Sequence, residues 1–124
     1  MTTNFSRQRV LAVVADDEPL LRMEMADLLT DEGFEVAEAT NAAQAMQHLE
    51  RLDGVAVLFT DIRMPGPRDG MALAREVAAR WPETRIVVCS ALLDPDLSAL
   101  PQGAHFFSKP FLHSAVCRVL RSEG

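Results

Sequence analysis

The stretch VAVLFTD, residues 55–61, decides how this chain folds. Its first five residues are all apolar, which is typical of a β-strand that is buried on both faces of a sheet. The run stops at Thr60 and Asp61, and a loop rich in proline and glycine follows from Met64 to Gly70. The pattern therefore predicts a central strand with an aspartate at its carboxyl end.

Similar short runs alternate with helical patterns on either side of this stretch. Further strands are expected at residues 10–15, 34–39, 85–90 and 104–108. Apolar residues at helical spacing separate them, at residues 19–33, 42–52, 73–81 and 112–120. Glu35 and Glu38 interrupt the second strand, which favours a place near the edge of the sheet. Because Pro95 and Pro101 lie between the fourth and fifth strands, any helix there should be short.

Five strands alternating with helices predict an α/β fold, a doubly wound parallel sheet with helices on both faces and right-handed crossovers. Ligands of such sheets bind outside the carboxyl ends of the strands, where the strand order reverses. The chain has 124 residues, and we expect one domain over residues 1–124 with a core at about 9–121.

Composition excludes several classes of partner. The chain carries 12 Lys and Arg against 18 Asp and Glu, a net charge of -6. This charge disfavours direct contact with nucleic acid. Since the sequence shows neither a signal peptide nor an apolar run long enough for a membrane span, we expect no membrane insertion and a cytoplasmic protein. Cys89 and Cys117 have no metal-binding spacing and are expected to be buried free thiols.

The polar residues that follow the predicted strands form a constellation. Asp16 and Asp17 end the first strand, Asp61 the third, Ser90 the fourth and Lys109 the fifth. Each residue alone has an ordinary explanation, such as a helix-start carboxylate, a turn hydroxyl or a solvated surface amine. Their coincidence at one edge of one sheet is what indicates a site.

The chemistry of this constellation is that of phosphoryl transfer. Carboxylates gathered in a cleft repel one another, and a bound Mg²⁺ relieves the repulsion through oxygen ligands. An aspartate beside the metal can attack phosphorus and form an aspartyl phosphate. Ser90 would donate a hydrogen bond to one phosphoryl oxygen, and Lys109 would place a positive charge near another.

Four segments of the chain resemble the receiver domain of two-component response regulators. They are VVADDEP at 13–19, TDIRMPG at 60–66, VCSA at 88–91 and SKPF at 108–111. The resemblance runs in order through nearly the whole chain. It implies a flavodoxin-like sheet with strand order 2-1-3-4-5, and transfer of a phosphoryl group to Asp61 from a sensor histidine kinase or a histidine phosphotransfer protein.

The resemblance also assigns roles by position. It implies that Asp17 and Asp61 bind Mg²⁺ directly and Asp16 through water, with the backbone carbonyl of Arg63 as a further ligand. Ser90 and Lys109 would then hold the phosphoryl group. The remaining implications are a switching aromatic at Phe106, a cis Lys109–Pro110 bond, and a phosphate lifetime tuned at Arg63 and Leu92.

The sequence is compatible with several modes of signalling. The expected protein is a signalling module that catalyses only its own phosphorylation and dephosphorylation, with no attached output domain and an unknown downstream partner. It could act directly, as a phosphorelay intermediate or as a phosphate sink, or be a receiver cut from a larger protein. The short interval between Ser90 and Lys109 predicts a truncated fourth helix, and with it a monomer or weak dimer. A phosphohydrolase similar to the haloacid dehalogenases is disfavoured, because its Asp-x-Asp pattern is missing after the first strand.

Overall fold

The computed structural model describes residues 10–91 and 96–121, in which strands and helices alternate. The elements are β1 (Leu11–Ala15), α2 (Pro19–Asp31), β2 (Glu35–Ala39), α3 (Ala42–Leu52), β3 (Val57–Asp61), α4 (Gly70–Arg80), β4 (Arg85–Ser90), the 3₁₀ turn η1 (Leu97–Ala99), β5 (His105–Ser108) and α5 (His113–Arg121).

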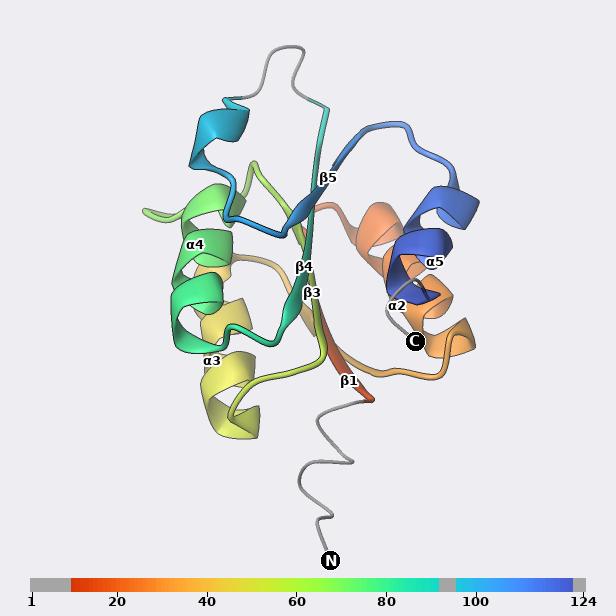
Figure 1. Ribbon diagram of the computed structural model, residues 1–124, viewed down its shortest axis with the longest axis horizontal. Coiled ribbons are helices and arrows are strands. Elements are labelled where there is room, and N and C mark those ends of the chain that lie inside the picture. The colour runs from red at the N-terminus through yellow and green to blue at the C-terminus, as the bar shows by residue number, and fades with distance from the viewer. Residues whose placement is uncertain (1–9, 92–95, 122–124) are drawn as a thin grey trace, which may run out of the picture.

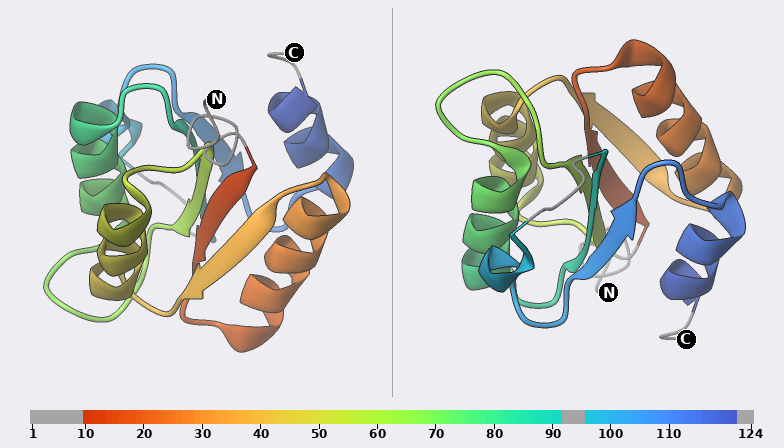
Figure 2. Two further views of the ribbon diagram at one scale, coloured as in Figure 1. Left: turned by 90° about the horizontal axis from the view of Figure 1, so that it is seen from below. Right: turned by 90° about the horizontal axis from the view of Figure 1, so that it is seen from above.

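The strands form one parallel sheet in the order β2-β1-β3-β4-β5, so the predicted fold and strand order are confirmed. As the two glutamates indicated, β2 lies at an edge. Figure 1 shows α3 and α4 on one face of the sheet and α2 and α5 on the other. The carboxyl ends of the strands point to the top of Figure 1, and the right-hand view of Figure 2 looks down on them.

Alternating side chains of the central strands fill two cores. Val13 and Leu58 belong to the cluster beneath α3 and α4, whereas Val14 and Phe59 belong to the cluster beneath α2 and α5. All four side chains are at most 1% exposed. This two-sided burial is the reason why β1 and β3 are continuous apolar runs rather than alternating ones.

The helices begin where their side-chain caps are available. Asn41 caps α3: its Oδ1 accepts a hydrogen bond from the Gln44 amide at 2.8 Å. Asp69 caps α4 in the same way, with its Oδ1 2.9 Å from the Ala72 nitrogen. Each cap satisfies an amide that the first turn of a helix would otherwise leave without a partner.

Two arginines attach α5 to the rest of the domain. Arg85, at the start of β4, donates from Nη1 to the carbonyl oxygens of Val119 and Leu120, both at 2.9 Å. At the end of α5, Arg121 forms a two-pronged ion pair with Glu32, which follows α2. The terminal carbonyls of a helix carry partial negative charge, so the Arg85 guanidinium is a favourable partner for them.

The structure corrects some details of the sequence reading. Trp81 follows α4 instead of belonging to it: its backbone has φ -132° and ψ 77°, because a residue that precedes a proline disfavours the helical conformation. The only regular structure described between β4 and β5 is η1; Leu92 and Pro95 lie outside the described residues. Cys89 is fully buried as expected, and burial raises the pKa of its thiol, but Cys117 is only half-buried.

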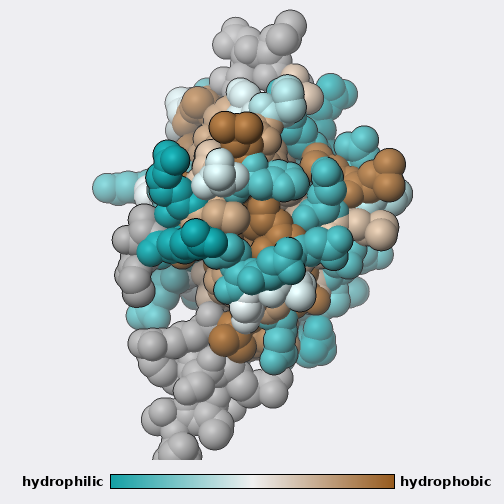
Figure 3. Space-filling model, turned by 90° about the vertical axis from the view of Figure 1, so that its right-hand side faces the viewer, coloured by the Kyte–Doolittle hydropathy of each residue, from teal (hydrophilic) through white to brown (hydrophobic). Residues whose placement is uncertain are grey.

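The outer face of α2 and α5 carries apolar side chains among polar ones. Figure 3 shows brown hydrophobic patches between teal hydrophilic atoms on this side of the molecule. Leu20 and Met23 of α2 and Leu112, just before α5, are each more than half exposed. Within residues 10–91 and 96–121, no helix has both the length and the apolar character needed to cross a bilayer.

Candidate functional site

Three carboxylates meet at the carboxyl ends of the two central strands. Asp61 is the last residue of β3, and Asp16 follows β1, whose Ala15 pairs with Thr60. Asp17 comes next in the chain, and one carboxylate oxygen from each aspartate lies within 4.8 Å of the others. Asp16 and Asp61 are buried, whereas Asp17 is exposed. Adjacent parallel strands thus place residues 45 positions apart side by side, and the resulting group can hold a metal ion.

Lys109 reaches this group from beyond β5. Its Nζ donates a hydrogen bond to Asp61 Oδ2 at 3.0 Å and lies 3.5 Å from Asp16 Oδ2. Its own amide donates to the Ser90 carbonyl at 2.8 Å, which extends the β4–β5 ladder to this residue. Burial lowers the pKa of the ammonium, but the hydrogen bond to Asp61 and the neighbouring negative groups outweigh it, so the pKa is raised. Lys109 is therefore held in its charged form.

The Asp16 carboxylate is only partly satisfied. Its Oδ1 accepts a hydrogen bond from the Glu18 amide at 2.9 Å. Its Oδ2 has no hydrogen-bond partner among the residues described, and the 3.5 Å contact with Lys109 is an ionic one. Burial raises the pKa of Asp16, and the charges of Asp61 and Asp17 add to this, against the Glu18 hydrogen bond and Lys109. A buried carboxylate oxygen without a donor is costly, and a divalent cation would satisfy it.

Gly70, at the start of α4, packs against the backbone of Asp61. A Cβ atom at Gly70 would lie 1.7 Å from the Asp61 carbonyl oxygen and 2.9 Å from Thr60 Oγ1. The Gly70 amide also donates to the Ile62 carbonyl at 2.7 Å. The first turn of α4 therefore packs directly on the end of β3, and only a residue without a side chain allows this approach.

A pocket of about 550 Å³ gives access to the carboxylates of Asp17 and Asp61 from solvent. Its lining is formed by Asp17, Glu18, Asp61, Arg63, Met64 and Pro65. The ionisable donors of the site are all carboxylates, with no thiol or imidazole in the group. Oxygen donors of this kind suit a hard cation such as Mg²⁺, and the unsatisfied Asp16 Oδ2 is consistent with such a ligand.

The other residues predicted for the site lie around this centre. Ser90 is fully buried at the end of β4, adjacent to the strand that ends in Asp61. The Arg63 amide donates to Asp61 Oδ1 at 3.3 Å, while its exposed side chain lines the pocket. Phe106 is half-buried against the core beneath α3 and α4. The Lys109–Pro110 bond is cis, as predicted.

Two residues near the site were missed by the sequence reading. The sequence placed Gly70 at the end of a loop rich in proline and glycine and predicted the next helix from residue 73, whereas the structure makes Gly70 the first residue of α4. Arg22, whose Nη1 donates to the Asp16 carbonyl at 2.9 Å, was not considered at all. An arginine on an amphipathic helix gives no local signal of this contact, which arises from the packing of α2 on the sheet.

Comparisons with known proteins identify the family of this chain. The family model of the response regulator receiver domain matches residues 12–121. The chemotaxis protein CheY of Thermotoga maritima is 37% identical over 117 residues, which cover 91% of this chain and 94% of that protein. The regulator NtrC of Escherichia coli is 34% identical over 119 residues, 93% of this chain but only 25% of NtrC. Receiver sequences of this kind thus occur in relatives of very different length.

A solved structure supports the same assignment at the level of the fold. The response regulator receiver protein from Sinorhizobium medicae WSM419 superposes with a TM-score of 0.84 at 27% identity, covering 93% of this chain and 94% of that one. The parallel sheet, the acidic group at its carboxyl edge and the sequence match all lead to one conclusion: this chain belongs to the response regulator receiver domain family.

Proposed function

We propose that this chain accepts a phosphoryl group on Asp61 in a Mg²⁺-dependent reaction and thereby switches its binding to a partner protein. The observation that carries the proposal is the hydrogen bond from Lys109 to the Asp61 carboxylate, which belongs to the acidic group of Asp16, Asp17 and Asp61. A carboxylate that is paired with a lysine, accessible through a pocket and surrounded by potential metal ligands has the surroundings of a phosphoryl acceptor.

Each residue contributes one function to the transfer. A carboxylate oxygen of Asp61 attacks phosphorus, the new O–P bond forms, and the P–N bond to the donor's histidine breaks. Asp16, Asp17, Asp61 and the Arg63 carbonyl would hold Mg²⁺, which when bound neutralises charge on the phosphoryl oxygens. Lys109 would pair with one of these oxygens, and the Ser90 hydroxyl would donate to another. No external base is needed, because the nucleophile is already a carboxylate.

Phosphorylation would change the molecule through local charge. It replaces the single negative charge of the Asp61 carboxylate with a phosphoryl group that carries roughly -1.5 to -2 charges at the end of β3. Ser90 and Lys109 would move toward the phosphoryl oxygens, and Phe106, which pairs with Val88 in the sheet register, would fill the space that Ser90 leaves. The surface formed by β4, β5 and their connections would be remodelled for a downstream partner.

The proposed phosphodonor is a sensor histidine kinase or a histidine phosphotransfer protein. The exposed apolar residues of the α2–α5 side support a protein donor, since they lie next to site residues in the chain: Leu20 follows Asp17 by three positions, and Leu112 follows Lys109 by three. Exposed apolar groups a few positions along the chain from reactive residues favour contact with a protein rather than with a free small molecule.

The proposal is tested by direct phosphorylation. Incubation with acetyl phosphate and Mg²⁺ should add the mass of one phosphoryl group to the intact protein, and the label should be lost in hydroxylamine, which cleaves acyl phosphates. Excess chelator should prevent labelling, because without the cation the carboxylates repel the incoming phosphate. Equal labelling with and without Mg²⁺, or a label stable to hydroxylamine, would contradict the proposed chemistry.

Arg63→Ala should shorten the lifetime of the phosphorylated form by a few-fold. The Arg63 side chain is exposed at the pocket, where a long cation beside an acyl phosphate would restrict the approach of water. The measurement is the decay of labelled protein after removal of the phosphodonor. Arg51→Ala is the matched control, since Arg51 lies in the last turn of α3, away from the carboxyl edge of the sheet. Identical decay in wild type and Arg63→Ala would remove this role.

A further inference from the structure

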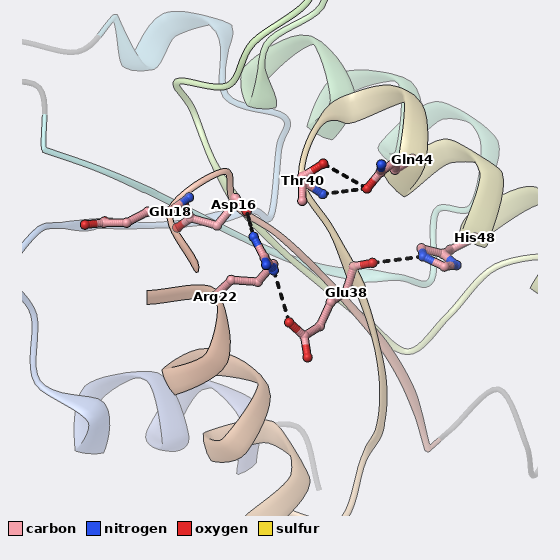
Figure 4. Close-up of polar contacts among 7 residues, drawn as sticks. All are labelled: Asp16, Glu18, Arg22, Glu38, Thr40, Gln44 and His48. Atoms are coloured by element: carbon pink, nitrogen blue, oxygen red, sulfur yellow. Dashed lines mark hydrogen bonds and ion pairs between the residues drawn. The ribbon is translucent and has the colours of Figure 1, made fainter. Parts of the chain in front are cut away.

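Arg22 of α2 connects the acidic site to the edge of the sheet. Its Nη1 donates to the carbonyl oxygen of Asp16 at 2.9 Å, and its Nε donates to Glu38 Oε1 at 3.0 Å. Figure 4 shows the guanidinium between these two residues, with one dashed contact to each. The Arg22 side chain is only 17% exposed, although it is charged and lies on an outer helix. A guanidinium so nearly buried and so specifically bonded is part of the fold around the site rather than a solvated surface group.

The contact with Arg22 completes the fixation of Asp16. The Asp16 amide donates to the Ala39 carbonyl at 3.0 Å, which ties the residue to β2. Its Oδ1 accepts from the Glu18 amide at 2.9 Å, and its carbonyl accepts from Arg22. The amide, the carbonyl and the carboxylate of this residue are therefore each held by a different neighbour. These three hydrogen bonds set the orientation of the Asp16 carboxylate, and with it the position of Oδ2 relative to Asp17 and Asp61.

The guanidinium is itself held in place by β2 and α3. The Glu38 side chain accepts a hydrogen bond from the guanidinium. The backbone carbonyl oxygen of Glu38 lies 3.0 Å from His48 Nε2 of α3. Figure 4 shows this chain of contacts running from Asp16 through Arg22 and Glu38 to His48. Arg22 thus links the end of β1 to a second strand and, through it, to a second helix. Lysine has one charged nitrogen and lacks the planar fork that makes two divergent bonds at once.

We infer that Arg22 is a positioning residue for the metal-binding carboxylates: it fixes the backbone of Asp16 and so keeps the buried carboxylate oriented for a divalent cation. The inference rests on the proposed function, in which Mg²⁺ binds to this acidic group. Arg22 touches neither the cation nor the phosphoryl group, and it acts only through Asp16. Groups that orient metal ligands from outside typically change metal affinity about 10- to 100-fold when removed.

Positioning and simple electrostatics predict opposite results for this residue. Arg22 is a positive charge close to an acidic group, so its removal should tighten cation binding if only charge matters. If Arg22 positions Asp16, its removal should weaken cation binding, because the carboxylate is no longer held in its orientation. The sign of the change in Mg²⁺ affinity therefore distinguishes the two roles without any measurement of phosphorylation.

The experiment is Mg²⁺ titration of the unphosphorylated protein by calorimetry, repeated with Mn²⁺ by electron paramagnetic resonance. Arg22→Met should raise the Mg²⁺ dissociation constant about 10-fold, at the low end of the range for such groups. Arg22→Lys should lie between wild type and Arg22→Met, since it keeps the charge but loses one of the two bonds. Glu38→Gln should stay near wild type, because the amide oxygen still accepts from Arg22.

Arg80→Met is the matched control. Arg80 is likewise a helix arginine in ion pairs, with Glu50 and Glu76, but it contacts no residue of the acidic site among the bonds described. Unchanged or tighter Mg²⁺ binding in Arg22→Met would overturn the inference. Thermal melting followed by circular dichroism checks that each variant is folded. If Arg22→Met does not fold, the Mg²⁺ affinity of Arg22→Lys tests the inference instead. An Arg22→Lys protein that binds Mg²⁺ as tightly as wild type would then overturn the inference. Failure of the wild-type protein to bind Mg²⁺ would instead reject the proposed function, and the inference with it.

Discussion

Replacing Asp61 with asparagine will abolish phosphorylation by acetyl phosphate, with a loss of labelling rate greater than about 100-fold. The reason is the loss of the nucleophile: an amide oxygen of the same shape carries no negative charge and does not form an acyl phosphate. The substitution also removes the anionic partner of the Lys109 ammonium, which lies 3.0 Å from Asp61 Oδ2. Intact-protein mass spectrometry over a time course measures the rate.

The fold should survive this change, so that the loss reports on chemistry. Asparagine has the size of aspartate, and its introduction removes one of three mutually repelling carboxylates. Asp27→Asn, on the exposed side of α2, is the matched control and should be labelled at the wild-type rate. Full labelling of Asp61→Asn would mean that the phosphoryl group attaches elsewhere, and the central assignment would be wrong.

Gly70→Ala should destabilise the protein by about 3 kcal/mol, near the upper end of the usual cost of overpacking. In an ordinary helix position the same substitution would be favourable by up to about 1 kcal/mol, because alanine is the better helix former. Here the new methyl group would lie 1.7 Å from the Asp61 carbonyl oxygen, so either α4 or the end of β3 must move. Phosphorylation should slow as well, because the displaced backbone is that of the proposed acceptor.

Urea unfolding monitored by circular dichroism measures the change in the free energy of unfolding. Gly66→Ala is an informative control, because a Cβ there meets nothing within 4 Å, although φ is +105°. Gly66→Ala should therefore cost only the strain of a left-handed backbone, about 1 kcal/mol, and leave phosphorylation near normal. A Gly70→Ala protein as stable as wild type would show that the contact between α4 and Asp61 is not close in solution.

The fold was predictable because its signals are local. The central strands β1, β3 and β4 are continuous apolar runs, and the residues Asp16, Asp61 and Ser90 mark where these runs stop. Once the strands are parallel, their carboxyl ends must share one edge, and the grouping of the aspartates follows from topology. The same argument placed Lys109 at that edge, where its Nζ meets Asp61.

The segment between β4 and β5 was less predictable. Two prolines excluded a long helix, and the structure describes only the short turn η1 there. Thr40 and Asn41 precede α3, and both side chains carry an oxygen that can cap a helix. The backbone decided in favour of Asn41, while the Thr40 amide and hydroxyl both donate to the Gln44 side chain.

The sequence by itself determined where the strands lie along the chain, which aspartates form the acidic group and which lysine joins them. Each of these features is marked by a change from apolar to polar residues at the end of a strand. Only the tertiary structure decided that Gly70 must lack a side chain and that Arg22 holds Asp16. Both facts depend on how closely a helix packs against the end of a strand, and the local pattern of residues does not indicate that distance.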